Sequence, residues 1–244
     1  MKPIISVIIP TYNEEDYIVK TLKCFKNQKT KVAYEVIVCD NNSTDNTVKL
    51  AKNYAKIVYE TKQGACFARN TGARYAKGEY FVFADADTIY PENFIEEVYK
   101  IFKSNKYAGF SCGVWDYYDG KSAKVKILTK IWSTLFYAYM TIQRWTNRMA
   151  LTGWCLCTPK KIFKQAKGFI KDKNYLEDLN YGYAIEYLGR YGYFPKIRVQ
   201  SSNRRFEKGF FNFIKHYKEI HAPISLFLHG LIRPRLTKPY SQVK

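Results

Sequence analysis

Short apolar runs alternate with helical patterns through the first part of the chain, and this alternation constrains the fold more than any other feature. The runs are rich in β-branched and aromatic residues and cover residues 4–9, 34–40, 57–59 and 80–84. Apolar residues at helical spacing follow the first three of them, at 16–27, 46–54 and 66–75. Buried strands that alternate with helices are typical of a parallel sheet. We therefore predict an α/β fold with an open, mostly parallel sheet flanked by helices.

Similar patterns continue in the rest of the chain. Strand-like runs cover residues 109–116, 151–157 and 193–199, and helical patterns cover 91–103, 124–145, the stretch from 160, and 179–189. Two prolines mark boundaries. Pro10 cannot donate to a sheet and is expected to end the first strand, and Pro91 is expected in the first turn of its helix.

The predicted helix over 124–145 carries an unusual stripe of apolar side chains. Eight apolar residues from Leu128 to Trp145 fall on one helical face, whereas Thr129 and Ser133 fall elsewhere. Two interpretations stay open. Either the helix packs on the sheet, or its aromatic stripe and cationic flanks lie in a membrane interface.

Charge and aromatic content narrow the class of partner. The chain has 244 residues, enough for a full core, with a formal net charge of +19 and 17% aromatic residues. This balance favours an anionic partner: nucleic acid, acidic lipid headgroups or phosphorylated small molecules. Many solvated lysines without such a partner are the alternative.

Cysteine usage and the lack of long apolar segments indicate a cytoplasmic protein. The six cysteines are scattered, and Cys155-x-Cys157 lacks the usual spacing of a structural zinc site, so we expect reduced, buried thiols. No apolar stretch reaches the roughly 20 residues of a spanning helix. No signal peptide is visible, since the N-terminus leads directly into a strand.

Two aspartates follow the apolar run 80–84. Side chains alternate along a strand, so Asp85 and Asp87 are expected to leave the sheet on the same side. Two neighbouring carboxylates repel unless a cation lies between them, and hard oxygen ligands suit Mg²⁺ or Mn²⁺ carrying a diphosphate. A solvated turn is the alternative, because Asp-x-Asp is a short and common pattern.

Five motifs together resemble a known family. They are Ser6-Val7-Ile8-Ile9-Pro10-Thr11-Tyr12-Asn13-Glu14, Asp40-Asn41-Asn42-Ser43-Thr44-Asp45, Ala68-Arg69-Asn70, Asp85-Ala86-Asp87 and Glu177-Asp178. Their order and spacing resemble family-two glycosyltransferases of GT-A fold over roughly the first 205 residues. The resemblance implies a Rossmann-like GT-A domain over 1–205, with a nucleotide-sugar half (1–120) and an acceptor half (121–205). The basic, aromatic stretch 206–244 is expected to form an amphipathic helical extension.

The resemblance also implies roles for individual residues. Those expected to bind the nucleotide sugar are Pro10, Thr11, Tyr12, Glu14, Asp40, Asn42, Gly64, Arg69, Asp85, Ala86, Asp87, Arg204 and Arg205. Asp87, with Asp85, is the expected ligand of Mg²⁺ or Mn²⁺. Asp178 is the expected general base with Glu177 beside it, and Gly153 and Trp154 are expected on the acceptor side. Solvated surface charges remain the alternative for Arg69, Arg204 and Arg205.

We expect an inverting glycosyltransferase that moves one sugar from a UDP- or GDP-linked donor to a lipid-linked or saccharide acceptor. A Gln-x-x-Arg-Trp motif does not follow Glu177-Asp178, which argues against a processive synthase. The basic, amphipathic surface suggests peripheral docking at an anionic membrane, on its cytoplasmic face. A sugar nucleotidyltransferase is a second reading, although a Gly-rich triphosphate loop is lacking near the start. A nucleic-acid-binding protein is a third, and it is disfavoured because Lys and Arg are spread along the chain.

Overall fold

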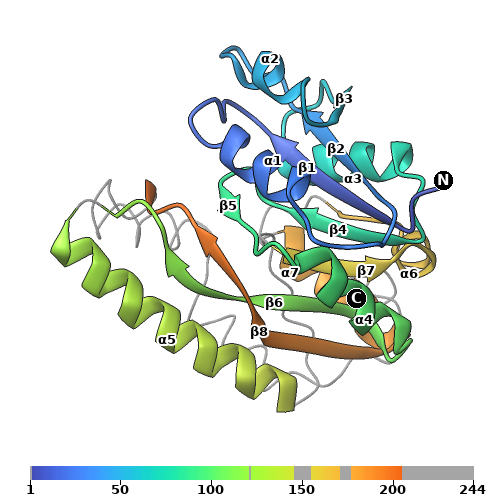
Figure 1. Cartoon of the computed structure of the whole chain (residues 1–244). Coiled ribbons are helices and arrows are strands. Elements are labelled where there is room, and N and C mark those ends of the chain that lie inside the picture. Colours follow the sequence, from blue (N-terminus) through green and yellow to red (C-terminus); the bar gives the residue numbers. More distant parts are fainter. Residues whose placement is uncertain (1, 121, 146–154, 171–176, 205–244) are drawn as a thin grey trace.

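An eight-stranded sheet organises the computed structural model, which describes residues 2–120, 122–145, 155–170 and 177–204 (Figure 1). The strands are β1 (Ile5–Thr11), β2 (Tyr34–Asp40), β3 (Lys56–Tyr59), β4 (Tyr80–Ala84), β5 (Thr88–Ile89), β6 (Tyr107–Tyr117), β7 (Cys155–Pro159) and β8 (Arg190–Ser201). The helices are α1 (Ile18–Lys26), α2 (Thr47–Ala51), α3 (Ala65–Tyr75), α4 (Phe94–Lys103), α5 (Ala123–Trp145), α6 (Lys160–Gln165) and α7 (Glu177–Ile185), followed by a 3₁₀ turn (Glu186–Leu188). The order across the sheet is β3-β2-β1-β4-β7-β6-β8-β5.

The first four long strands form the predicted parallel half of the sheet. Strand β1 pairs in parallel with β2 and with β4, and β2 pairs in parallel with β3. Both faces of β1 are buried: Val7 belongs to the core cluster under α1 and α4, and Ile8 to the cluster under α3 and α6. The near-continuous apolar runs are therefore explained by helices on both faces.

The second half of the sheet mixes directions. Strand β7 runs antiparallel to β4 and β6, β8 runs parallel to β6, and β5 runs antiparallel to β8. The α/β class and the excess of parallel pairs are confirmed. The short strand β5 was not predicted, because two residues carry too little pattern to be recognised.

Both proline predictions need correction. Strand β1 continues through Pro10 to Thr11. Its pairing with β4 ends at Ile8, so Pro10 pairs with β2 alone, where it lies opposite Cys39. Pro91 lies in a turn ahead of α4, where its carbonyl accepts the amide hydrogen of Phe94, the first helical residue.

Helix α5 packs on β6 and β8 through only part of the predicted stripe: Phe136 and Tyr139 pack against the core cluster that contains Met140. Thr129 and Ser133 are buried on its inner face, whereas Ile131 and Leu135 are exposed. The Thr129 hydroxyl donates to the carbonyl of Lys126 (3.0 Å) and the Ser133 hydroxyl to that of Thr129 (2.8 Å). Because the helix's own carbonyls satisfy these hydroxyls, polar residues can face the sheet. The expectation that both lie outside the packed face is wrong.

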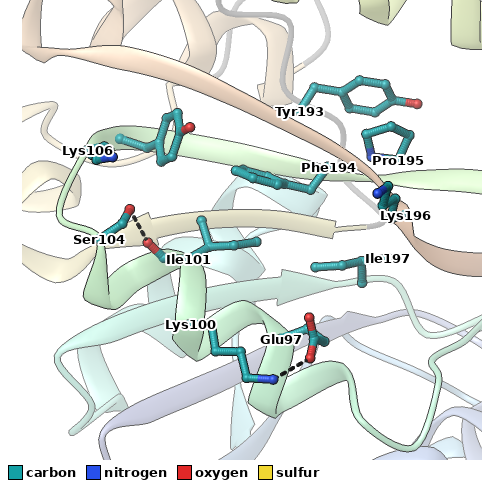
Figure 2. A pocket seen from close by; sticks show the side chains of 11 residues that line it. Glu97, Lys100, Ile101, Ser104, Lys106, Tyr193, Phe194, Pro195, Lys196 and Ile197 are labelled. Carbon is teal, nitrogen blue, oxygen red and sulfur yellow. Dashed lines mark hydrogen bonds and ion pairs between the residues drawn. The ribbon is translucent and has the colours of Figure 1, made fainter.

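A cavity of about 500 Å³ lies between α4 and the middle of β8 (Figure 2). Its walls include Ile101 and Ile197, with Lys100 and Lys196 at its rim, and none of the predicted site residues lines it. Helices of the described ranges are too short or too polar to cross a membrane. The predicted boundary at 205 and the extension 206–244 lie outside the described residues.

Candidate active site

The predicted donor residues gather at one edge of the sheet. Parallel strands β1, β2 and β4 end there at Thr11, Asp40 and Ala84, and Thr11 lies opposite Asp40 in the register. This carboxyl edge is where open α/β sheets bind ligands. Segments that follow the three strands therefore meet at one place, although they are far apart in the sequence.

Arg69 of α3 connects this edge to α7. Its Nη2 lies 3.1 Å from Asp85 Oδ1, and its Nη1 makes a close ion pair with Glu177 Oε1. Only 5% of the Arg69 side chain is exposed. Burial lowers the pKa of the guanidinium, but Glu177, Asp85 and Asp178 outweigh burial and raise that pKa above its usual range. A solvated surface charge, the alternative for Arg69, is wrong.

Arg204 makes a second bridge between two strand ends. Its two Nη atoms lie 2.7 Å from the two carboxylate oxygens of Glu14, and Nη2 also lies 2.9 Å from Asp87 Oδ2. The guanidinium stacks over the Tyr17 ring at 4.8 Å. Burial lowers the pKa of Arg204, and the contacts with Glu14 and Asp87 more than reverse this and raise it. Arg204 is therefore ion-paired at the site and not a solvated arginine.

Strand pairing brings Arg204 to Asp87. Strand β5 pairs with the end of β8, and the amide of Ser202 then donates to the Asp87 carbonyl at 3.1 Å. Asp119 holds the same segment: its carboxylate accepts from the Ser202 hydroxyl (2.6 Å) and from the amide of Asn203. These contacts position the backbone that carries Arg204.

The loop after β2 closes the other side of the site. Asp40 is buried, and its Oδ2 accepts the amide hydrogen of Ser43 at 3.1 Å. Asn42 Nδ2 donates to the carbonyl of Thr61 at 2.8 Å. Asn41 Oδ1 accepts the amide hydrogen of Gly64 at 2.7 Å, where φ is +139°, a conformation that glycine adopts without a steric penalty. This network joins the ends of β2 and β3 to the start of α3.

Asp85, Ala86 and Asp87 lie in the turn between β4 and β5 and not in an extended strand, so the expected strand alternation does not apply to them. The Ala86 side chain lies in the core, and its carbonyl accepts from the Thr21 hydroxyl at 2.7 Å. The two aspartates flank it and reach Arg69 and Arg204 respectively. Two guanidinium groups thus compensate the two carboxylates. Tyr12, also predicted at the site, is 51% exposed beyond the end of β1.

The acceptor side is only partly described. Glu177 and Asp178 form the first turn of α7, where the helix dipole favours negative charge. The Arg69 contact places Glu177 beside Asp85. Gly153, Trp154 and Arg205 lie outside the described residues.

Four residues of this site were not predicted from the sequence: Tyr17, Asn41, Tyr118 and Asp119. Burial and the carboxylates of Asp119 and Asp87 raise the pKa of Tyr118, so its phenol stays protonated. Its buried hydroxyl has no hydrogen-bond partner in the described part of the chain. A protonated donor near Asp87 and Arg204 suits an anionic ligand. An Asp-Gly pair after a strand was a signal for a turn at Asp119, but not for this contact.

The chemistry of Asp85 and Asp87 suits a divalent cation. Carboxylate oxygens are the hard ligands that Mg²⁺ and Mn²⁺ prefer. The guanidinium at 2.9 Å from Asp87 Oδ2 shows that positive charge is stabilised at this position. No third acidic or imidazole ligand joins them within the described ranges, so a cation there needs water or diphosphate oxygens to complete its shell.

Comparison with known proteins settles the family. Residues 6–166 match the family model described as "Glycosyl transferase family 2", which is more than half of the chain. The chain belongs to this family. All of the donor-side residues described above except Arg204 fall within the matched region.

Individual relatives of this family 2 chain agree with the assignment. It is 36% identical over 107 residues to "Glycosyltransferase GlyG" of Streptococcus pneumoniae, covering 41% of this chain and 35% of that protein. It is 33% identical over 108 residues to "UDP-Glc:alpha-D-GlcNAc-diphosphoundecaprenol beta-1,3-glucosyltransferase WfgD" of Escherichia coli, covering 42% of each. The chain thus spans well under half the length of these relatives.

Solved structures share the fold of the family 2 chain. The mannosyltransferase PcManGT of Pyrobaculum calidifontis, solved with GDP-Man and Mn²⁺, superposes with a TM-score of 0.65 at 22% identity. The match covers 95% of this chain and 69% of that one. The GT-A fold predicted from the five motifs is confirmed.

Proposed function

We propose that this family 2 chain is an inverting glycosyltransferase that moves one sugar from a UDP- or GDP-linked donor to a lipid-linked or saccharide acceptor. The observation that carries the proposal is the paired arrangement at the sheet edge. Asp85 and Asp87 lie in the turn that follows β4, and each contacts a different arginine. A diphosphate bound here meets guanidinium groups, which bind phosphate oxygens with charge-assisted hydrogen bonds.

The nucleotide half of the donor is expected between β1 and β2. The loop that contains Asn41 and Asn42 is fixed by its own hydrogen bonds, so its shape is set before a ligand arrives. Preorganised polar groups lose little entropy when they bind. Asp40 lies at the base of this loop and is proposed to accept a hydrogen bond from the base or ribose. The names of two similar proteins include UDP-Glc and GDP-Man, which support either nucleotide.

Proton transfer is assigned to the start of α7. Inversion requires a base on the acceptor's side of the sugar, opposite the leaving diphosphate. Arg69 contacts both Glu177 and Asp85 and so holds the start of α7 beside Asp85. We therefore assign Glu177 a positioning role. Asp178 is the residue proposed to take the acceptor's hydroxyl proton. A divalent cation, when bound by Asp87 and Asp85, supplies Lewis-acid stabilisation of the leaving diphosphate.

The exposed face of α5 supports an anionic membrane as a partner. Ile127, Ile131 and Leu135 follow one another at single-turn spacing and are each more than half exposed, and Trp145 at the helix end is 85% exposed. The chain has no acidic residue from 120 to 171. An apolar face among cationic side chains gains both from burial in the interface and from attraction to anionic headgroups.

The position of α5 relates this surface to the active site. Gly120 lies three residues before the helix, and a Cβ atom there would come within 2.2 Å of Asn203, the neighbour of Arg204. A membrane bound along α5 therefore lies near the segment that carries Arg204. A lipid-linked acceptor suits this arrangement, and the WfgD name describes such an acceptor for that relative.

Calorimetric titration tests the donor site. UDP, GDP, UDP-glucose, UDP-N-acetylglucosamine and GDP-mannose are titrated with and without Mn²⁺ into the wild type and into Asp87→Ala. We expect one nucleotide to bind in a metal-dependent way and to lose that dependence in Asp87→Ala. Glu92→Gln, an exposed carboxylate paired with Lys29, is the control and should bind as the wild type does.

Two outcomes would contradict the proposal. If no nucleotide binds under any metal condition, the assignment of Asp40, Asp85 and Asp87 fails. If incubation with a nucleoside triphosphate and a sugar phosphate releases pyrophosphate, the chain is a nucleotidyltransferase. A transfer assay with short-chain prenyl-diphosphate saccharides then identifies the acceptor class.

A further inference from the structure

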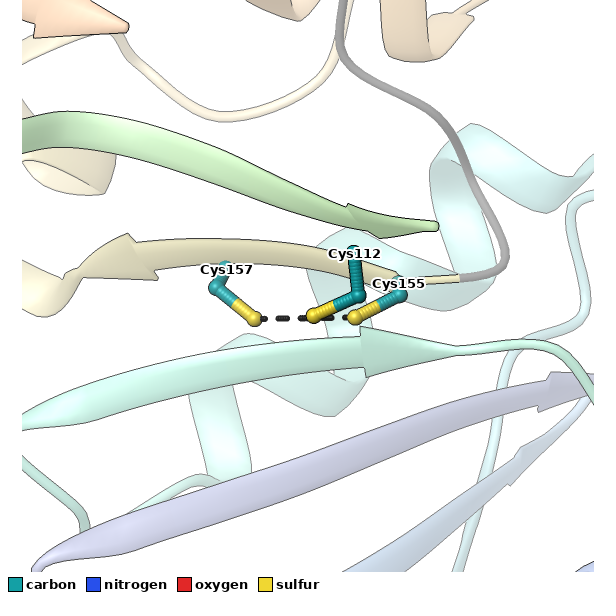
Figure 3. Close-up of side chains that lie close together, drawn as sticks. All are labelled: Cys112, Cys155 and Cys157. Carbon is teal, nitrogen blue, oxygen red and sulfur yellow. Dashed lines mark hydrogen bonds between the residues drawn. The ribbon is translucent and has the colours of Figure 1, made fainter. Parts of the chain in front are cut away.

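Three buried cysteines converge in the core next to the proposed active site. Cys112 of β6 and Cys155 and Cys157 of β7 place their sulfur atoms within 4.8 Å of one another, and none is more than 1% exposed (Figure 3). The Sγ atoms of Cys155 and Cys157 are 4.0 Å apart. The sequence predicted scattered, reduced, buried thiols without a usual zinc spacing; all three are free and buried, but pairing of distant strands brings them together.

Strand pairing explains the convergence. Cys155 and Cys157 are two residues apart on β7, so their side chains share one face. The antiparallel register places Phe110 opposite Cys157 and Ser111 opposite Leu156, and one further step places Cys112 opposite Cys155. The three cysteines therefore meet through the pairing of β6 with β7. A search of the sequence for closely spaced cysteine pairs does not reveal such a group.

The sulfur geometry is close to that of a three-coordinate metal. Metal–sulfur bonds of about 2.3 Å place three sulfur atoms around one centre about 4.0 Å apart. One pair already has this separation, and the others need movements of less than about 1 Å. No fourth His, Cys, Asp or Glu of the described residues joins the group.

The thiols also have the chemistry of ligands. Burial raises the pKa of Cys112 and Cys157 well above the usual value, and only at Cys155 do hydrogen bonds from the other two thiols outweigh burial and lower the pKa. Thiolate is the form that binds metals, and sulfur ligands select Cu⁺ and Zn²⁺ over the hard cations that Asp87 suits. The cysteine cluster and the aspartates are therefore chemically separate.

We propose that Cys112, Cys155 and Cys157 form a three-sulfur site for a single thiophilic cation, Cu⁺ or Zn²⁺. Each thiol that binds the ion forms one S–metal bond and releases its proton to solvent, so binding strengthens as pH rises. The proposed site is close to the donor edge, because Cys155 of β7 pairs with Ala84, the last residue of the neighbouring strand β4. Tyr90 lies between the two sites: its oxygen accepts the Asp85 amide hydrogen at 3.1 Å, and burial, followed by the charges of Asp85 and Cys155, raises its pKa.

Metal uptake by the reduced, chelator-treated full chain tests the site. Cu⁺ is presented from its bicinchoninate complex, and Zn²⁺ is measured by competition with a chromophoric chelator. We expect one equivalent of one of these ions to bind. Affinity should fall at least about tenfold in Cys112→Ala and Cys157→Ala. Cys39→Ala, a buried thiol of the other core cluster, should bind as the wild type does.

A second measurement does not depend on variants that could fail to fold. X-ray absorption of the loaded wild type should show three sulfur neighbours at about 2.3 Å. Absence of uptake, uptake that is unchanged in Cys112→Ala, or a shell of nitrogen and oxygen would overturn the proposal. A Cys112–Cys155 disulfide in the untreated chain, with no metal uptake after reduction, would also overturn it.

Discussion

The guanidinium of Arg204 lies 2.9 Å from the carboxylate of Asp87, although more than a hundred residues separate them in the chain. The same guanidinium makes a bidentate pair with Glu14. A positive group therefore stands at the position proposed for the donor's cation and diphosphate. In the proposed donor complex Arg204 exchanges these partners for the diphosphate, and this exchange gives the first prediction.

Replacing Arg204 by Gln is expected to change the binding of cation and donor in opposite directions. Without a competing guanidinium, Mn²⁺ should bind the nucleotide-free chain about three- to tenfold more tightly, since like charges no longer oppose it. Donor affinity should fall, because a phosphate contact is lost. Electron paramagnetic resonance of free Mn²⁺ and calorimetry with the donor measure the two effects. Arg190→Gln, an exposed arginine of β8, is the control and should change neither.

Replacing Arg69 by Met is expected to destabilise the fold strongly. Asp85 and Glu177 would lose the buried guanidinium that compensates them, and breaking a buried ion pair costs about 3–5 kcal/mol. Arg74→Met is a matched control on the same helix, because Arg74 is largely exposed and its partner Glu60 is 3.7 Å away. It should cost under about 1 kcal/mol. Urea unfolding measures both, and equal losses would contradict the role of Arg69.

Replacing Asp178 by Asn is expected to reduce turnover without reducing donor binding. Loss of a general base lowers kcat by about 10²–10⁴-fold. Glu177→Gln should instead lower the free energy of unfolding as well as kcat, since Glu177 is held by Arg69. Single-turnover rates measure the loss of turnover in each variant, and donor titrations show whether donor binding is unchanged. Full activity of Asp178→Asn would remove it as the base.

Glu60 predicts a defined pH dependence of stability. Its carboxylate accepts from the Thr71 hydroxyl and the Lys62 amide, which lower its pKa below the usual value of 4.5. A pKa lowered in the folded state adds stability above the unfolded pKa, and this stability is lost as pH falls through the folded pKa. Glu60→Gln should therefore destabilise the chain at pH 7. The difference from wild type should shrink as pH falls below 4.5 and through the lowered folded-state pKa, as urea unfolding at several pH values can show.

The outer face of α5 predicts membrane binding. Sedimentation with anionic vesicles should capture the wild type, and high salt should release it. Ile131→Glu and Leu135→Glu should each weaken binding about tenfold or more, because each removes an exposed apolar side chain that the membrane would bury and adds repulsion. Tyr75→Glu, an exposed aromatic residue on α3, adds the same charge elsewhere and is the control. No binding of the wild type would remove the membrane from the proposal.

The first half of the fold and its donor edge could be predicted from local sequence. Apolar runs such as 4–9 and 80–84 must be covered on both faces, so they become central parallel strands whatever follows them. Polar residues directly after these runs, including Asp40 and Asp85, then lie at one edge by geometry alone. Strand and helix types were predicted correctly for this reason, and the boundaries of these elements were displaced by at most three residues.

Other features depended on the order and register of strands far apart in the chain. Pairing of β5 with β8 brought Arg204 to Asp87, and pairing of β6 with β7 brought Cys112 to Cys155 and Cys157. Helical periodicity could not show which face of α5 is buried, because hydroxyls bonded to the helix's own carbonyls pack as well as apolar groups. The sequence by itself determined the sheet and the residues at its edge, since local patterns specify burial. Only the tertiary structure decided which charged and sulfur atoms meet, since that depends on contacts between distant segments.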